Sequence, residues 1–182
     1  FSRCLCGLEK KFKGQVKING QLWKNRQLLK NCYMVMQDVG HQLFTDSVLE
    51  ECRLGIQSPD EAQIDRALNL LELEPYKDRH PLSLSGGQKQ RLAVAVSLIC
   101  GRDLLIFDEP TSGLDLASME EVGKLAQELS RCGKLLLIIT HDVEFMKNIC
   151  SRILILSGGR IVADLTGEER EDAERLLRGE YQ

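Results

Sequence analysis

The sequence of 182 residues has no long apolar segment and no excess of basic residues. Its longest apolar runs, LAVAVSLIC and LLLII, are much shorter than the roughly 20 residues that cross a bilayer. The net charge is −3, whereas proteins that bind nucleic acid usually carry a clear excess of Lys and Arg. We therefore expect neither a membrane-spanning segment nor a nucleic-acid partner, and any work at a membrane would need another chain to span it.

The seven cysteines contain no Cys-x-x-Cys motif and are scattered along the chain. An odd number without such spacing favours free thiols in a reducing cytosol over a disulfide framework or a zinc site. Free cysteines are often small buried side chains, and we expect this of most of them. The pair Cys4 and Cys6 is too isolated to indicate a metal site.

A third absence is that of the Gly-x-x-x-x-Gly-Lys-Ser/Thr loop that binds nucleotide phosphates in many proteins. The stretch LSGGQ nevertheless places Ser85, Gly86 and Gly87 directly before a predicted helix. Backbone N–H groups at a helix N-terminus attract anions. This stretch therefore predicts a turn that can bind a phosphate group.

Apolar periodicity predicts alternating helices and strands. A helix is expected in SPDEAQIDRALNLLELEP, with Ser58 as N-cap, Pro59 in the first turn and Pro75 after its end. GQVKINGQ predicts a strand ending at a turn of Asn19 and Gly20, and CYMVMQ is a second short apolar run.

Three later apolar runs, 103–110, 134–142 and 152–164, predict further strands, with a helix over 120–130 between the first two. The third run is expected to turn at Gly158 and Gly159. Runs that are apolar throughout fit strands covered on both faces, so we expect a parallel sheet flanked by helices. Thr166 and Glu169 form a capping-box pattern that predicts a partly exposed, acidic helix in the tail.

Polar residues end several of these apolar runs, and ligands of parallel α/β sheets bind beyond the carboxyl ends of the strands. Asp108 could hold Mg²⁺, and Glu109 beside it could orient or deprotonate a water molecule. His141 could hydrogen-bond a phosphate oxygen or a water molecule. Taken singly, these residues and Gln37 are equally compatible with ordinary solvated strand ends.

Their order along the chain resembles the ATP-binding domain of ABC ATPases: Gln37, LSGGQ, LLIFDEP, SGLD and THD. The most specific part lies at residues 84–88 and 104–115, and the similarity extends from Phe1 to about Ala163. The resemblance implies a P-loop NTPase-like α/β fold with a mostly parallel sheet, flanking helices and an α-helical subdomain. It also implies ATP and Mg²⁺ as ligands.

The resemblance implies one role for each motif residue. Gln37 resembles the glutamine that contacts Mg²⁺ and the attacking water, Asp108 the aspartate that supports Mg²⁺, and Glu109 the glutamate that polarises water. His141 resembles the histidine that contacts the γ-phosphate, and Asp115 the residue that communicates across a dimer.

The residues Ser85, Gly86, Gly87 and Gln88 resemble the signature turn of this family. There the turn closes over ATP held by the facing subunit, so a second ABC ATPase subunit or half is the implied partner.

The resemblance divides the chain into four parts. Residues 1–40 correspond to the ATP-binding core after the phosphate-binding loop, and 41–100 to a helical subdomain ending in the signature turn and its helix. Residues 101–163 complete the core, and 164–182 form a C-terminal helix. Because the loop would directly precede Phe1, the N-terminal strands and the P-loop are expected to be absent from this chain. We expect the chain alone to be inactive and to expose apolar surface at a sheet edge.

The sequence QDVGHQLF at 37–44 resembles energy-coupling-factor ATPases, which drive uptake of vitamins or metal ions. This implies an integral membrane transport subunit bound near Gln37 and a peripheral position on the cytoplasmic face of the cell membrane. Leu43, Phe44, Val48 and Leu49 either supply apolar contacts to that subunit or belong to the core.

Two other functions remain open. The chain could belong to a non-transport ABC ATPase of translation or DNA maintenance, against which the acidic balance and the lack of a long coiled coil weigh. It could also be a non-catalytic module that donates its signature turn to a partner, against which the joint presence of Glu109 and His141 weighs.

Overall fold

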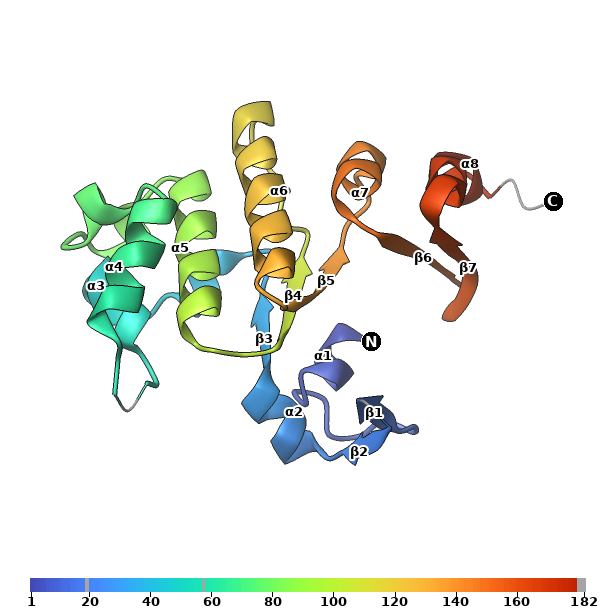
Figure 1. Ribbon diagram of the computed structural model, residues 1–182, viewed down its shortest axis with the longest axis horizontal. Helices are drawn as coiled ribbons and strands as arrows, with labels where there is room; N and C mark the ends of the chain where they lie inside the picture. Colours follow the sequence, from blue (N-terminus) through green and yellow to red (C-terminus); the bar gives the residue numbers. More distant parts are fainter. Residues whose placement is uncertain (19, 57, 180–182) are drawn as a thin grey trace.

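The computed structural model describes residues 1–18, 20–56 and 58–179. A three-stranded parallel sheet, with strand order β3-β4-β5, lies at the centre (Figure 1). Its strands are β3 (Cys32–Val35), β4 (Leu104–Asp108) and β5 (Leu135–Ile139). The expectation of an α/β fold with a parallel sheet flanked by helices is confirmed.

Strand β4 is covered on both faces, which explains its continuous apolar sequence. Leu105 and Phe107 belong to a core cluster with residues of α5 (Gly86–Ile99) and α6 (Leu116–Arg131). Leu104 and Ile106 belong to a second cluster on the other face, together with Cys6 next to α1 (Ser2–Leu5). The predicted helix over 120–130 is confirmed as part of α6.

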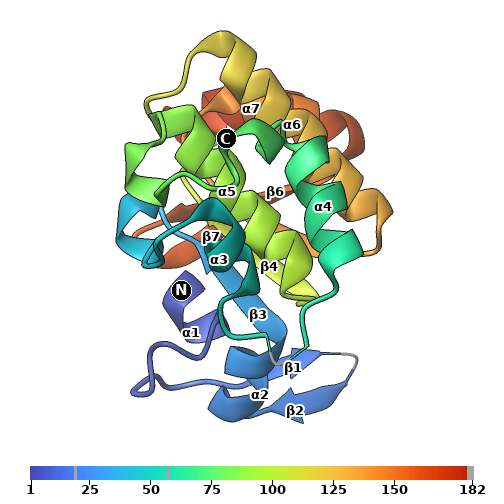
Figure 2. The ribbon, with the colours of Figure 1, turned by 90° about the vertical axis from the view of Figure 1, so that its left-hand side faces the viewer.

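The N-terminal elements lie together at one end of the molecule in both views (Figures 1 and 2). They are α1, the antiparallel hairpin of β1 (Val16–Ile18) and β2 (Gln21–Trp23), and α2 (Asn25–Asn31). Asn19 of the predicted turn lies outside the described residues, whereas Gly20 has φ +78°, a value that glycine adopts readily.

The helical part packs against α5 and contains α3 (Val48–Arg53) and α4 (Glu61–Leu70), with short 3₁₀ turns at Val39–Gln42, Glu74–Tyr76 and Pro81–Ser83. The predicted start of α4 at Ser58 is wrong: Asp60 is the N-cap and accepts from Gln63 N–H at 3.2 Å. One reason is that Asp is as good an N-cap as Ser, and the Asp60 side chain makes the capping hydrogen bond.

The sequence predicts that this helix continues as far as Pro75. This end is also wrong, since α4 already ends at Leu70. The chain turns at Glu72, whose φ of +54° is left-handed. This turn places Leu73 in the core, with its N–H donating to the Leu68 carbonyl at 2.7 Å. Burial of Leu73 thus decides the helix end, and Pro75 follows in a 3₁₀ turn.

The run at 152–164 does not join the parallel sheet, contrary to expectation. It forms an antiparallel hairpin of β6 (Arg152–Ser157) and β7 (Arg160–Thr166). Gly158 and Gly159, with φ of +55° and +76°, reverse the chain within two residues, whereas a parallel partner needs a crossover of about a dozen residues. One face packs against α7 (Val143–Ile149) and α8 (Ala173–Leu177).

The predicted tail helix begins as a 3₁₀ helix, Gly167–Asp172, and becomes α-helical only in α8. Thr166 N–H donates to the Glu169 carboxylate at 3.2 Å, as the capping-box pattern predicts.

Strand β5 pairs only with β4 within the described residues. Leu135 is 63% exposed, and the other residues of β5 are only half-buried. The expected apolar surface at a sheet edge is therefore present along β5. No helix among the described residues is both long and apolar enough for a membrane span.

Candidate functional site

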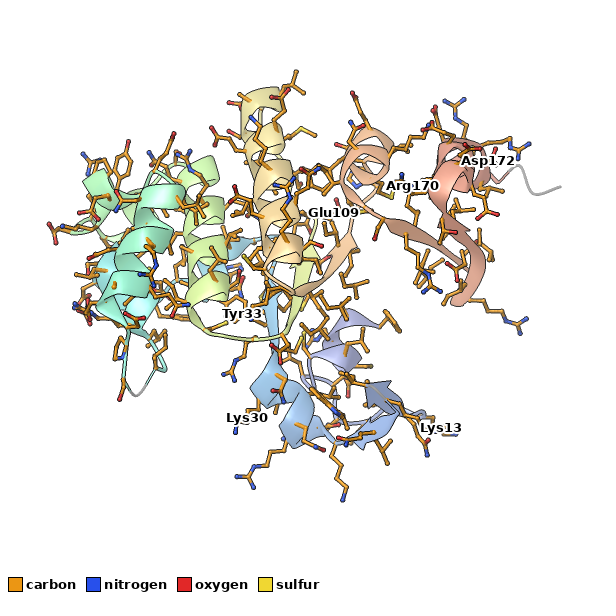
Figure 3. The ribbon with its side chains drawn as sticks, viewed as in Figure 1. Lys13, Lys30, Tyr33, Glu109, Arg170 and Asp172 are labelled. Carbon is orange, nitrogen blue, oxygen red and sulfur yellow. The ribbon has the colours of Figure 1, made fainter. Side chains whose placement is uncertain are left out.

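The carboxyl ends of β4 and β5 lie side by side and bring two predicted site residues together. Asp108 pairs with Ile139 in the parallel register, and the N–H of Glu109 donates to the Ile139 carbonyl at 2.8 Å. Glu109 therefore directly follows the paired strand and lies near the loop that carries His141. Figure 3 shows Glu109 beside α6, above the central sheet.

Glu109 and His141 are in direct contact. The His141 Nδ1 atom lies 3.0 Å from Oε1 of Glu109, within hydrogen-bonding distance. The Glu109 side chain is 19% exposed, whereas that of His141 is 86% exposed. The hydrogen bond and the charge of Glu109 raise the pKa of His141 above its ordinary value. The pair therefore favours an imidazolium whose second ring nitrogen is accessible to a ligand.

The backbone of Glu109 is strained, because φ is +48°, a left-handed value that is uncommon for a residue other than glycine. Its buried Oε2 atom lies 3.0 Å from His141 Nδ1, but among the described residues no contact of this atom has the geometry of a hydrogen bond. Buried polar atoms are nearly always hydrogen-bonded, and backbone strain concentrates at functional sites. Both features fit a carboxylate that binds a water molecule.

Asp108 lies at the last position of β4 and is half-buried. The described residues contain no cluster of three or more His, Cys, Asp or Glu side chains that could hold a metal by themselves. Mg²⁺, however, usually takes one or two carboxylates from the protein and its other ligands from phosphates and water. Asp108 next to Glu109 fits a Mg²⁺ ion bound in that way.

The predicted phosphate-binding turn is exposed at the start of α5. Ser85 is the N-cap: its Oγ accepts from Gln88 N–H at 3.3 Å, and its own N–H donates to Gln88 Oε1 at 2.9 Å. Gly86 and Gly87 occupy the first turn, where a helix offers its N–H groups no internal acceptor. The turn therefore presents donors to solvent.

This turn lies beside the start of α6. A Cβ atom on Gly87 would lie 3.5 Å from Ser118 Oγ. Asp115 caps α6 by accepting from Ser118 N–H at 2.8 Å. Hydrogen bonds from the backbone and the side chain of Ser118 lower the pKa of Asp115. The predicted residues 85–88 and Asp115 thus form one surface. Among the described residues, no hydrogen bond or ion pair joins this surface to Glu109 or His141.

Gln37 is exposed two residues beyond the end of β3. Val35 pairs with Phe107, so Gln37 and Glu109 both follow a paired position by two residues, at the same edge of the sheet. Gln42 fixes this segment: its Oε1 accepts from Met36 N–H, and its Nε2 donates to the Met34 carbonyl, both at 2.6 Å.

The four apolar residues proposed for a membrane partner separate into two kinds. Leu43 and Val48 are buried in the core cluster, so the alternative that they belong to the core holds for these two. Phe44 is 75% exposed, and Leu49 is partly buried against the core. The buried Glu51 accepts from the N–H groups of Phe44 and Thr45 at 2.9 Å, and this holds Phe44 at the surface.

Three structural links were missed by sequence reasoning: those made by Gln42, Glu51 and Arg91. Arg91 Nη1 lies 2.9 Å from Glu121 and 3.3 Å from Glu72, and so connects α5 to α6 and to the turn after α4. The sequence offers one weak signal for Gln42, its place in QDVGHQLF. Glu51 and Arg91 contact partners that no local pattern connects to them.

Comparison with known proteins shows which family this geometry resembles. A family model described as ABC transporter matches residues 1–112. A putative ABC transporter ATP-binding protein of Treponema denticola is 56% identical over 176 residues, which cover 97% of this chain and 36% of the relative. The energy-coupling factor transporter ATP-binding protein EcfA2 of Methanospirillum hungatei is 36% identical over 159 residues, which cover 84% of this chain and 40% of EcfA2.

Solved structures give the same answer. CbiO1 from Clostridium perfringens, part of the ABC transporter complex CbiONQ, has a TM-score of 0.83 at 27% identity, covering 98% of this chain and 76% of CbiO1. A dimeric ATP-binding cassette in a post-hydrolysis state, bound to ADP and Pi, has a TM-score of 0.76 at 26% identity. The match covers 90% of this chain and 78% of the cassette. The chain spans about a third of the length of the first curated relatives that it matches.

Proposed function

This chain belongs to the ABC transporter family, and we propose that it forms part of an ATP-binding subunit that couples ATP hydrolysis to transport. The contact between Glu109 and His141 at the tips of β4 and β5 is the observation that carries this proposal. It unites a carboxylate and an imidazole from separate strands at the edge where α/β sheets bind ligands.

In the proposed reaction, Glu109 orients a water molecule and accepts its proton as the oxygen attacks the γ-phosphorus of ATP. The bond to the leaving ADP oxygen breaks in the same displacement. His141 keeps Nδ1 against Glu109, and its exposed Nε2 donates to a phosphate oxygen. Asp108, with Gln37 at the same sheet edge, would hold Mg²⁺, which neutralises phosphate charge when bound.

We infer that the signature turn serves a different nucleotide from that of Glu109, because among the described residues no hydrogen bond or ion pair connects the turn to Glu109 or His141. Ser85 and Gly86 are exposed and Gly87 is half-buried, and this turn offers donors that fit the phosphates of ATP on a second subunit. Asp115 lies beside this turn and would face the same partner. The similarity to a dimeric ATP-binding cassette supports this arrangement.

The 182-residue chain by itself is proposed to be inactive, because its sequence contains no Gly-x-x-x-x-Gly-Lys-Ser/Thr loop. That loop supplies the Lys and backbone N–H groups that hold the β- and γ-phosphates. Calorimetry on the chain should detect no tight ATP binding. Micromolar affinity for ATP would contradict this part of the proposal.

Trans-complementation tests the signature turn. The chain is mixed with an ABC subunit that has an intact phosphate-binding loop, and ATP hydrolysis is measured. Ser85→Arg should abolish the stimulation by blocking the turn, whereas Glu109→Gln should leave the partner's site working. Ser83→Arg, at an exposed position two residues earlier, is the matched control. Equal stimulation by wild type and Ser85→Arg would refute the role of the turn.

The transport partner is proposed to be an integral membrane subunit of an importer, bound on the inner face of the cell membrane through the segment around Phe44. The relatives EcfA2 and CbiO1 support this reading. Phe44→Asp should weaken co-purification with the membrane subunit by at least tenfold, while Leu156→Asp, at an exposed position of β6, should not. Co-purification that survives Phe44→Asp would exclude this docking segment.

A further inference from the structure

Two buried thiols meet where the N-terminal elements join the central sheet. Cys6 follows α1, and Cys32 is the first residue of β3. Their Sγ atoms lie 3.0 Å apart, although the two residues are 26 positions apart in the sequence. Cys6 is 4% exposed and Cys32 is 8% exposed. No other pair among the seven cysteines is in such contact within the described residues.

The surroundings of the pair are apolar. Leu104 and Ile106 of β4 share its cluster, with Leu5 and Met34 packed against it. The thiol of Cys32 hydrogen-bonds to Cys6 and lowers the pKa of Cys6, whereas the same contact and burial raise the pKa of Cys32. A thiolate is the reactive form of cysteine, and Cys6 is the one of the two whose pKa is lowered.

The backbone keeps Cys6 in place. Gly7 has φ +70°, and a Cβ atom there would lie 2.7 Å from the Asn25 carbonyl oxygen. The end of α1 is thus packed closely against the start of α2, with no room for a larger residue. Cys6 cannot easily move away from β3, so the two sulfurs stay close in the folded protein.

We propose that Cys6 and Cys32 form a reversible disulfide, a modification site for which hydrogen peroxide is the oxidant. The Cys6 thiolate attacks one peroxide oxygen, the O–O bond breaks, and the released hydroxide takes up a proton as water. Cys6 is then a sulfenic acid. Cys32 sulfur attacks the Cys6 sulfur, which loses its hydroxyl as a second water when the Cys32 proton is transferred. Two thiols and one peroxide thus give one disulfide and two waters, and a dithiol reductant reverses the change.

The disulfide closes a covalent ring over residues 6–32, which contains β1, β2 and α2. A crosslink stabilises a fold mainly by restricting the unfolded chain. Oxidation should therefore raise the melting temperature of the N-terminal part by several degrees. This inference is independent of the proposed ATPase function.

Peptide mapping of the peroxide-treated protein under non-reducing conditions tests the proposal, in a Cys132→Ser background that removes the exposed thiol. The intact mass should fall by about 2 Da, as expected for the loss of two hydrogens on disulfide formation. Trypsin should yield residues 4–10 linked to 31–53. These peptides also contain Cys4 and Cys52, so Cys4→Ser and Cys52→Ser are matched controls that should retain the link.

The variants Cys6→Ser and Cys32→Ser should lose the linked peptide, and dithiothreitol should release it from the wild type. Oxidised and reduced wild type should differ in melting temperature, whereas Cys6→Ser should show no oxidant-dependent change. Mapping of the wild type gives a result that does not depend on the folding of any variant. The peroxide dose is set on the wild type by complete oxidation of its exposed Cys132. If that dose yields no Cys6–Cys32 link in the wild type or in the Cys132→Ser background, or links Cys4 or Cys52 instead, the proposal is wrong.

Discussion

Strands β4 and β5 have nearly the same kind of sequence, LLIFD and LLLII, yet very different surroundings. Strand β4 lies between two strands and is covered on both faces, so its first four residues are buried. Strand β5 has one partner among the described residues, and its first residue, Leu135, is exposed. An apolar run therefore predicts a strand, but its burial depends on neighbours that the run itself does not specify.

The residues just beyond the two strands differ in burial in the same way as the strands themselves. Glu109, beyond β4, is mostly buried and conformationally strained, whereas His141, beyond β5, is almost fully exposed. The proposed base is thus held by the better-packed strand, and the residue proposed to contact phosphate lies at the solvent-facing tip. Catalytic bases need such fixed placement relative to the water that they activate.

Truncation of one apolar side chain in each strand should show the difference in burial most clearly. Phe107→Ala in β4 removes a fully buried ring and should lower the free energy of unfolding by about 3–5 kcal/mol. Leu135→Ala in β5 should change it by no more than about 0.5 kcal/mol, because that side chain is exposed. Urea unfolding of both variants measures the difference, and similar losses would show that β5 is covered in solution.

Helix caps after the two strand tips should give a smaller, matched effect. Asp115 caps α6 after β4, and Asp142 caps α7 after β5 through the Phe145 N–H at 2.9 Å. Replacement of either by Ala should cost about 1 kcal/mol of unfolding free energy, whereas Asn should retain most of the cap. Thermal unfolding can compare all four variants; a loss with Asn as large as that with Ala would argue against capping.

The weakest expected effect is the pH dependence of the contact between the two tips. Glu109 raises the pKa of His141 in the folded state. The stabilisation of the folded protein by this contact is therefore complete below the ordinary pKa of about 6.5, and it is lost as the pH rises through the higher folded value. NMR titration of the His141 ring should show the raised pKa, and Glu109→Gln should return it towards the ordinary value. A wild-type pKa at or below that value would contradict the contact.

The sequence predicts the strands of the central sheet, α5, α6 and the exposed turn at Ser85, because these rest on local periodicity and capping. The predicted turn at Gly158 and Gly159 is confirmed. The run at 152–164 is nevertheless wrongly assigned to the parallel sheet, although a two-residue glycine turn is itself a signal for a hairpin. The links made by Glu51 and Arg91 are not predictable in this way, since their partners meet only in the folded chain. Likewise, hydrophobicity alone does not separate the buried Leu43 from the exposed Phe44.

ATP turnover by the intact protein carrying Glu109→Gln tests the central claim most directly. If Glu109 accepts the proton of the attacking water, hydrolysis should fall by about 10²–10⁴-fold. ATP should remain bound, and an ATP-bound dimer should persist in size-exclusion chromatography. Glu144→Gln, at an exposed position in α7, should hydrolyse ATP at the wild-type rate. Unchanged hydrolysis by Glu109→Gln would contradict the assignment of the site at the tips of β4 and β5.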